Sequence, residues 1–510
     1  MKLDELYATL RRRGVLWPSA EIYGGTQGLY DYGPLGWGLK RRLEDAWTAW
    51  FVGLSPDYHR IEPAEILPEA VVRASGHLEN FTDPEVTCES CHTAFRAETV
   101  LEKVRPEGVD GLSAEQIGEI VRAQQVRCPS CGSTQLSVPR PFNLMFATDL
   151  GVTGRERGYL APETAQASYL AFARMWDVAR RRLPLGIAVV GKAYRNEIAP
   201  RQVLFRMRSF TQAELQIFFD PAGFPVPFDR AADEVVPVLR ADRRSAVGDA
   251  GAEPRTGRQL VADGLPEFYV YHLVHQFRFL RDVLGFPAER LRYFEKSTAE
   301  RAFYNRIQFD AELKLDSLGG YKEIAAIHYR GDYDLTRHGV GAKRDLSVTP
   351  TGHPTVLPHV LELTFGVDRN VWALADVHLA ADGERTVWHL PSYLAPAPVG
   401  VFPLIPKAQG DAAERLAHDL RVAGVPAVFD DAGTIGKRYA RMDEAGAPFC
   451  VTVDGGSVGD GPERGTVTLR ERDSRAQSRV PIVGLADRLR PSLLPPRPSP
   501  APAGDAPPAQ

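Results

Sequence analysis

Four of the five cysteines stand in two closely spaced pairs. Cys88 and Cys91 form one Cys-x-x-Cys pair, and Cys128 and Cys131 form a second pair after 36 intervening residues. Two such pairs can place four thiolates in a tetrahedron around Zn²⁺. A closed Cys₄ site leaves no open coordination position, so the spacing predicts a structural zinc site and not a catalytic one. The fifth cysteine, Cys450, lies in an apolar run and is expected in a buried strand.

A second group of reactive side chains lies between residues 191 and 214. This segment predicts two strands joined by a loop that carries Arg201. Alternation would place Arg195 and Glu197 on one face of the first strand, and Phe210 and Glu214 on one face of the second. Arginine for an α-phosphate, glutamate for the adenine amine and phenylalanine for stacking would form a nucleotide site. Taken alone, the segment fits surface ion pairs on a hairpin better.

A later segment strengthens the nucleotide interpretation. Glu362 is expected on a strand, and Gly366, Asp368 and Arg369 follow at a strand-to-helix junction, since residues 370–375 are expected to be helical. The chain has neither a GxxxxGK phosphate loop nor a dinucleotide fingerprint. Any ATP must therefore be held by side chains on a sheet.

At this point the sequence resembles a known family. Arg195-Asn196-Glu197 is similar to motif 2 of the class II aminoacyl-tRNA synthetases, and the segment 366–369 is similar to motif 3. Over roughly residues 5–490 the chain resembles the homodimeric type of glycyl-tRNA synthetase, of subclass IIa. Further matching segments are 19–25, 30–36, 75–84, 140–146, 162–166, 330–335, 436–439 with 443–444, and 451–454.

The resemblance implies a two-step ligase reaction. Glycine would be activated with ATP to glycyl-adenylate, with release of pyrophosphate, and the glycyl group would pass to the 3′ end of tRNA-Gly. The implied cofactors are ATP as a substrate, Mg²⁺ and a structural Zn²⁺. The implied assembly is a homodimer with tRNA and glycine as partners. Positioning and charge stabilisation would supply most of the rate.

The resemblance also assigns roles to individual residues. Arg195, Glu197 and Arg369 would be catalytic, with Arg195 on the α-phosphate and on the amino-acid carboxylate. ATP would contact Arg195, Asn196, Glu197, Phe205, Arg206, Phe210, Glu323, Ile324, Gly366, Asp368 and Arg369. Glycine would contact Arg96, Glu163, Phe210, Glu214, Glu362, Thr364 and Gly366. Zinc would be held by Cys88, Cys91, Cys128 and Cys131.

Five positions around the expected amino-acid pocket depart from the family pattern. They are Ala161, Ala167, Ser209, Leu363 and Thr364. The residues expected to contact ATP are retained, so ATP-dependent activation is the stronger expectation and strict glycine identity the weaker one. Two alternatives remain: a diverged paralogue that uses another small amino acid or acceptor, and a non-catalytic nucleic-acid-binding subunit.

The elements that must position these residues predict an α+β protein. Strands are expected at 186–194, 203–219, 321–335 and 359–363, and helices at 39–52 and 268–285, which together suggest one large, mainly antiparallel sheet. Alternating strands and helices after residue 399 suggest a C-terminal α/β domain, which the resemblance makes anticodon-binding. The expected domains are a catalytic core (1–85 and 139–395), a zinc-binding insertion (86–138), an anticodon-binding domain (396–490) and a disordered Pro-rich tail (491–510).

Composition agrees with a multidomain globular protein. The chain has 510 residues, 44% of them hydrophobic, and a formal net charge of −4 from 61 Lys and Arg against 65 Asp and Glu. This slight negative charge is an average over domains and does not exclude RNA binding by one basic face. No apolar run reaches the roughly 18 residues of a membrane helix, so a cytoplasmic location without membrane contact is expected.

Overall fold

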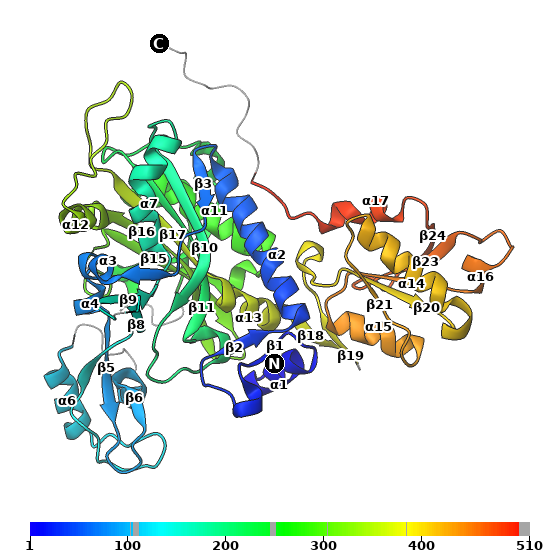
Figure 1. The fold of residues 1–510 in the computed structure, drawn as a ribbon, viewed down its shortest axis with the longest axis horizontal. Coiled ribbons are helices and arrows are strands. Elements are labelled where there is room, and N and C mark those ends of the chain that lie inside the picture. Colours follow the sequence, from blue (N-terminus) through cyan, green and yellow to red (C-terminus); the bar gives the residue numbers. More distant parts are fainter. Residues whose placement is uncertain are drawn as a thin grey trace.

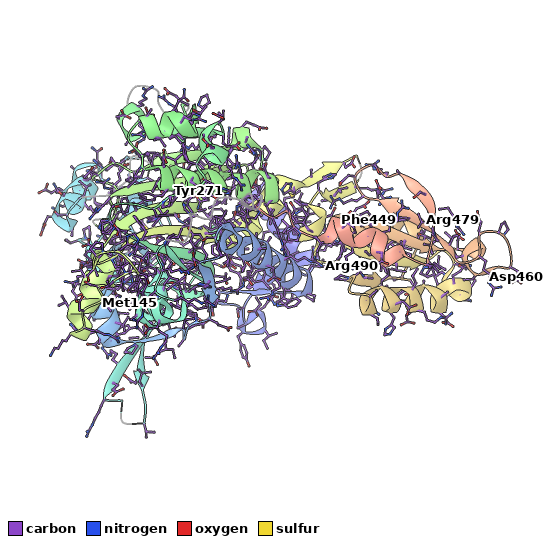
Figure 2. All side chains as sticks on the ribbon, turned by 90° about the horizontal axis from the view of Figure 1, so that it is seen from above. Met145, Tyr271, Phe449, Asp460, Arg479 and Arg490 are labelled. Carbon is purple, nitrogen blue, oxygen red and sulfur yellow. The ribbon has the colours of Figure 1, made fainter. Side chains whose placement is uncertain are left out.

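A computed structural model describes residues 1–102, 104–105, 112–152, 154–244, 251–302, 304–383 and 385–498. It contains a larger body built on one sheet, a small module between residues 82 and 143, and a C-terminal domain that stands to the side of the larger body (Figure 1). Figure 2 labels Phe449, Asp460, Arg479 and Arg490 on the C-terminal domain, and Met145 and Tyr271 on the larger body.

A nine-stranded sheet forms the centre of the larger body. Its pairs are antiparallel except β10 with β3 and β12 with β14. In spatial order the strands are β13 (Glu253–Thr256), β12 (Val235–Leu239), β14 (Leu291–Glu295), β15 (Ile307–Leu315), β16 (Gly320–Gly331), β17 (His359–Gly366), β11 (Ser209–Phe219), β10 (Leu185–Tyr194) and β3 (Tyr58–Ile61). The sheet confirms the predicted α+β class.

Alternation along the central strands separates an apolar face from a polar face. In β17, Leu361, Leu363 and Phe365 are buried in the main core, whereas Glu362 and Thr364 lie on the opposite face. The apolar face packs against helices α2 (Pro34–Phe51), α11 (Glu267–Arg278) and α13 (Val367–His378). Because side chains alternate across a strand, the same sequence that builds the core also presents a row of polar groups on the other side.

The polar face is only partly covered. Helix α7 (Ala165–Val178) packs against it through Tyr169 and Phe172, which contact Phe218, and Leu335 of α12 (Tyr333–Ala342) belongs to the same cluster. The remainder of the face is open to a cavity. The other elements of the larger body are α1 (Leu3–Arg12), β1 (Leu16–Pro18), β2 (Tyr30–Tyr32), β4 (Ile66–Pro68), α3 (Glu69–Ala74), α4 (His77–Asn80), β8 (Ala147–Leu150), β9 (Glu156–Leu160), α8 (Asp229–Ala232), α10 (Gly257–Ala262), β18 (Leu379–Asp382) and β19 (Arg385–Trp388).

The small module has its own sheet and its own core. Strand β5 (Thr82–Thr87) pairs with β6 (Ala94–Arg96) on one side and with β7 (Arg140–Asn143) on the other. Helices α5 (Ala97–Leu101) and α6 (Ala114–Ala123) complete it, and the side chains of Val86, Phe95 and Ile117 form its centre. A core this small needs a further cross-link for stability, which the cysteines can provide.

The C-terminal domain contains the predicted alternation of strands and helices. Its five-stranded sheet has the order β21 (Ala427–Phe429), β20 (Val399–Pro403), β22 (Phe449–Val453), β23 (Thr466–Glu471) and β24 (Gln477–Pro481), with helices α14 (Pro406–Val422), α15 (Ile435–Glu444), α16 (Gly455–Val458) and α17 (Leu485–Leu489). Helix α14 begins at Pro406, because proline is well suited to the first helical position. Cys450 is buried in β22, as expected.

Several predicted boundaries were wrong. The single strand expected at 203–219 is divided into a 3₁₀ turn (Val203–Phe205) and β11, and the strand expected at 321–335 ends at Gly331, which has a φ of +70° that breaks the strand. Helix α11 ends at Arg278 and continues as a π-helical turn to Val283. The tail expected to be disordered from 491 begins with a 3₁₀ turn (Arg490–Leu493), and residues 499–510 lie outside the described residues.

Among the described helices, none has an apolar stretch long enough to cross a lipid bilayer.

Candidate active site

A cavity of about 400 Å³ lies over the polar face of the large sheet. Its floor comes from β11, β15, β16 and β17, and Arg96 of the small module lies at its edge. All but two of the ATP- and glycine-contacting residues predicted from the sequence line this one cavity. They are Arg96, Glu163, Arg195, Glu197, Phe205, Arg206, Phe210, Glu214, Glu323, Glu362, Thr364, Gly366, Asp368 and Arg369.

Two predicted residues do not line it. The Ile324 side chain is fully buried in the main core, and its carbonyl oxygen accepts a hydrogen bond from Asn370 Nδ2 at 2.9 Å. Asn196 follows Arg195 along the chain, and its backbone nitrogen donates to the Leu144 carbonyl oxygen at 2.7 Å. These two residues shape the cavity through the backbone.

Arg195 is held at the mouth of the cavity by its neighbours. Strand β10 ends at Tyr194, so the expectation that Arg195 and Glu197 share a strand face was wrong: both lie in the irregular segment that follows. Arg195 Nε donates to the Pro162 carbonyl oxygen at 3.1 Å, and the guanidinium lies 5.2 Å from each of the Phe81 and Phe210 ring centroids. This packing fixes the plane of a cation that can bind an anion.

Glu197 presents a buried carboxylate oxygen to the same space. Arg206 Nε lies 3.6 Å from Glu197 Oε2, which is an ion pair too long for a hydrogen bond. That oxygen is buried and has no hydrogen-bond partner in the described part of the chain. A buried acceptor of this kind favours a ligand that brings an N–H group.

Arg369 and Glu323 form an ion pair on the opposite wall. Arg369 Nη1 lies 3.0 Å from Glu323 Oε1 and donates to the Glu323 carbonyl oxygen at 3.2 Å. Burial alone would raise the pKa of Glu323, but the neighbouring cations Arg369 and Lys296 outweigh it and lower that pKa. The carboxylate is therefore charged at neutral pH.

Asp368 lines the cavity but is occupied by protein partners. Its carboxylate accepts hydrogen bonds from the Tyr32 hydroxyl and from the Thr211 backbone nitrogen. It stands in the first turn of α13, where a negative charge is favourable. These contacts join β2, β11 and α13, so its role here is to position the site.

Three glutamates line the cavity; Glu214 and Glu362 are buried, and Glu163 is partly exposed. Glu214 Oε2 accepts from Thr164 Oγ1 at 2.8 Å. Burial first, and then the charges of Glu362 and Glu163, raise the pKa of Glu214 to about 8, although the threonine hydroxyl groups favour its ionised form. In the absence of a cationic ligand, Glu214 is therefore largely protonated near neutral pH.

The other two acids are already balanced by cations. Glu362 Oε2 accepts from Arg330 Nη1 at 2.9 Å and from Gln216 Nε2 at 2.7 Å. Glu163 Oε1 accepts from Gln166 Nε2 at 2.8 Å, and His77 Nε2 lies 3.6 Å from it. Burial would raise the pKa of Glu163, but His77 and Arg330 lower it well below its usual range.

The cavity also contains residues without a predicted ligand contact. Arg330 forms two hydrogen bonds with Asp334, at 2.9 and 3.0 Å, in addition to its bond with Glu362. Tyr304 lies over Arg330, with 4.2 Å from the guanidinium to the ring centroid. Residues 330–335 were among the matching segments, so the signal for Arg330 was present but carried no assigned role. His328 also lines the cavity.

The four paired cysteines meet in the small module. Cys88 Sγ lies 3.6 Å from Cys131 Sγ, and Cys91 Sγ lies 3.7 Å from Cys128 Sγ. All four sulfurs lie within 4.8 Å of one another. Four thiols at this spacing fit tetrahedral coordination of one zinc ion.

Comparison with known proteins agrees with this geometry. The family model for the anticodon binding domain matches residues 398–491. The chain is 36% identical to a glycine–tRNA ligase of Thermococcus gammatolerans over 96% of its own length and 98% of that protein, and 35% identical to a glycine–tRNA ligase of Methanothermobacter thermautotrophicus over 94% and 97%.

A solved structure shares the overall fold. Prolyl-tRNA synthetase of Cryptosporidium parvum, complexed with L-proline and AMP, aligns with a TM-score of 0.54 and 14% identity, covering 96% of this chain and 74% of that one. An antiparallel sheet with an arginine- and glutamate-lined cavity, a C-terminal anticodon-binding domain and full-length identity of about 35% agree with one another. The chain belongs to the glycine–tRNA ligases, within the class II aminoacyl-tRNA synthetases.

Proposed function

We propose that the chain activates glycine with ATP to glycyl-adenylate and transfers the glycyl group to the 3′ end of tRNA-Gly. The observation that carries this proposal is the cavity whose wall holds Arg195, Arg206 and Arg369 together with Glu163, Glu214 and Glu362. Cations suit the phosphates of ATP, and acids suit the ammonium group of an amino acid. The full-length relatives named glycine–tRNA ligases support the choice of glycine.

Arg195 and its neighbours would hold the nucleotide. Arg195 contacts the α-phosphate, Arg206 and Arg369 contact the outer phosphates, and the base stacks on Phe210. Glu197 Oε2, which is buried without a hydrogen-bond partner in the described residues, accepts from the adenine amine. Each contact relies on a side chain that already lies in the wall of the cavity.

The part of the cavity lined by Glu163, Glu214 and Glu362 would hold glycine. Its ammonium group pairs with Glu214, with the balanced acids Glu163 and Glu362 beside it. Glycine's carboxylate oxygen attacks the α-phosphorus of ATP while the bond to pyrophosphate breaks, and the terminal hydroxyl of tRNA then displaces AMP from the acyl carbon. The protein contributes position and charge and forms no covalent bond.

Two metals fit the residues present. Glu323 and Asp310 both line the cavity, and their carboxylate oxygens are ligands that Mg²⁺ prefers. Bound there, Mg²⁺ would neutralise the charge of the outer phosphates. The four clustered thiols of the small module would hold a structural Zn²⁺.

We further propose a homodimer, a cytoplasmic location, and the domain limits 1–85 with 139–395, 86–138 and 396–490.

Pyrophosphate exchange across a panel of amino acids tests the proposal. Purified protein with ATP and Mg²⁺ is expected to exchange pyrophosphate into ATP with glycine and not with alanine or serine, and to charge tRNA-Gly. Exchange with another small amino acid alone would identify a paralogue. Of the five departures from the family pattern, Thr364 lines the cavity and makes this worth testing, whereas Ala161, Ala167, Ser209 and Leu363 are not among the lining residues. Absence of exchange with every amino acid would reject the proposal.

A further inference from the structure

His328 has a buried ring nitrogen that the activation chemistry described above does not use. It lies on β16 opposite Glu362 of β17, and it lines the cavity. Nδ1 is 3.4 Å from Glu362 Oε1 and 3.0 Å from Asn305 Nδ2. Nε2 is buried and has no hydrogen-bond partner within the described part of the chain.

A chain of hydrogen bonds determines which nitrogen of His328 carries the proton. Lys296 Nζ lies 3.3 Å from the carboxylate of Asp310, which accepts a hydrogen bond from Gln308 Nε2 at 3.0 Å. Because the Gln308 amide nitrogen faces Asp310, its carbonyl oxygen accepts from Asn305 Nδ2 at 3.0 Å. The same Asn305 nitrogen donates to His328 Nδ1, so Nδ1 is the acceptor.

These contacts assign the hydrogen of a neutral His328 to Nε2. Burial lowers the pKa of His328, with Arg330 acting in the same direction, while Glu362, Glu323 and Glu163 oppose it. In a histidine, Nε2 lies farther from the backbone than Nδ1. Because His328 lines the cavity, this buried N–H group belongs to the cavity wall.

The surroundings of His328 limit the ligand atoms that can meet this donor. Its row of the sheet contains Gln308, Glu362 and Gln216, and the next row contains Ala326, Thr364 and Glu214. The acids of these rows attract an ammonium group, which is not an acceptor. An α-amino acid bound by its ammonium group offers one acceptor group, its carboxylate.

We propose that His328 is a substrate-contacting residue whose Nε2–H donates a hydrogen bond to the carboxyl oxygen of the bound amino acid, and later to the acyl carbonyl oxygen of the adenylate. This inference rests on the proposed function. A neutral donor suits this place because it orients the carboxyl group without adding a second cation beside Arg330. The proton stays on Nε2: when the tRNA hydroxyl attacks the acyl carbon, the ester bond forms, the acyl–phosphate bond breaks, and AMP leaves with the hydroxyl proton.

Substitution of His328 by glutamine and by alanine tests whether the side chain donates a hydrogen bond to the substrate or only fills space. The amide nitrogen of glutamine can occupy the place of Nε2, so His328→Gln is expected to keep glycine-dependent exchange within about 3-fold of the unmodified protein. His328→Ala is expected to lower kcat/KM for glycine by about 10- to 100-fold. KM for ATP is expected to change by less than about 2-fold. His378→Gln, whose Nε2 bonds the Leu284 carbonyl oxygen away from the cavity, is the matched control.

The outcomes are distinguishable from failure of the proposed function. If the unmodified protein does not activate glycine, the proposed function fails first. If it does, equal activity of His328→Ala and the unmodified protein overturns the inference, and so does equal loss in His328→Gln and His328→Ala. Should the alanine variant fail to fold, ¹⁵N-histidine spectra of the intact protein decide: glycine with ATP is expected to shift the Nε2–H signal of His328, and an unchanged signal rejects the contact.

Discussion

Thr364 Oγ1 donates a hydrogen bond to Glu214 Oε1 over 2.9 Å. The two residues stand opposite each other in the paired strands β11 and β17, and the other oxygen of Glu214 accepts from Thr164. Because its hydroxyl group is hydrogen-bonded to Glu214, the side chain of Thr364 has one preferred rotamer, which also fixes the position of its methyl group. That place is in the row of Ala326, where the amino acid is proposed to lie.

Thr364→Ser is therefore expected to weaken the discrimination between glycine and alanine. Serine keeps the hydrogen bond to Glu214 and removes one methyl group from the pocket. A methyl group in a pocket is worth about 1 kcal/mol or more, so the ratio of kcat/KM for glycine to that for alanine is expected to fall by about 5- to 10-fold. Pyrophosphate exchange with both amino acids measures the ratio, and an unchanged ratio would place the methyl group outside the pocket.

The raised pKa of Glu214 predicts a pH dependence of stability. Between its ordinary value near 4.5 and about 8, the folded protein holds a proton on Glu214 that the unfolded chain has lost. The unfolded state then binds fewer protons, so the contribution of this group to stability falls as pH rises through that window. Without glycine, the melting temperature of the unmodified protein is expected to fall more between pH 5.5 and 8.5 than that of Glu214→Gln. Each kcal/mol by which the two proteins differ in lost unfolding free energy corresponds to about 2 to 4 °C.

Glycine should oppose that loss. The ammonium group of glycine stabilises the ionised carboxylate, so glycine is expected to raise the melting temperature more at pH 8.5 than at pH 5.5. Glu214→Gln removes the titrating group and should remove this difference. A stabilisation by glycine that is equal at both pH values in the unmodified protein would show that Glu214 does not meet the ammonium group.

Much of this site could be predicted from the sequence, and the exceptions have physical reasons. Glu214, Glu362 and Arg369 belong to segments that the resemblance assigned to one substrate site, and the structure brings them to one cavity. Arg195 was expected on a strand, but β10 ends one residue earlier, at Tyr194. The alternation of apolar and polar residues does not indicate where the chain leaves the sheet. The tautomer of His328 depends on Asn305, Gln308 and Asp310, whose contacts arise only in the folded chain.

Removal of the guanidinium at position 195 tests the ATP end. Arg195→Ala is expected to lower glycine-dependent exchange by about 100-fold or more, because a charged contact to the reacting phosphate is lost. Arg195→Lys keeps the charge but loses the planar group between Phe81 and Phe210, so an intermediate loss is expected. The melting temperature should change little in both variants. Full exchange activity of the alanine variant would show that the α-phosphate binds elsewhere.

Zinc content can be tested separately from activity. The purified protein is expected to contain about one zinc ion per chain by mass spectrometry. Cys128→Ser should lower that content and increase the proteolysis of residues 82–143, whose core is small. Cys450→Ser is the matched control, since Cys450 is buried in β22 outside the cluster. A chain without zinc that resists proteolysis as well as the zinc-loaded chain would contradict a structural role.

A hydrogen-bonded ion pair crosses the junction between the larger body and the C-terminal domain. Asp443 of α15 is buried and forms two hydrogen bonds with Arg470, at 2.8 and 3.1 Å, while Arg385 of β19 in the larger body reaches the same carboxylate at 3.3 Å. Arg385 therefore ties the anticodon-binding domain to the body that holds the active site. The tie is half-exposed, so its loss should cost about 0.2–1 kcal/mol.

Arg385→Ala is consequently expected to separate the two steps of the reaction. Glycine-dependent pyrophosphate exchange needs only the cavity and should be unchanged, whereas kcat/KM for tRNA charging should fall by about 2- to 5-fold, because the domain that meets the anticodon is held less firmly. Arg464→Ala removes an exposed ion pair with Asp460 inside the C-terminal domain and should affect neither step. If charging by Arg385→Ala stays normal, or if exchange falls with it, the ion pair does not position the domain for tRNA.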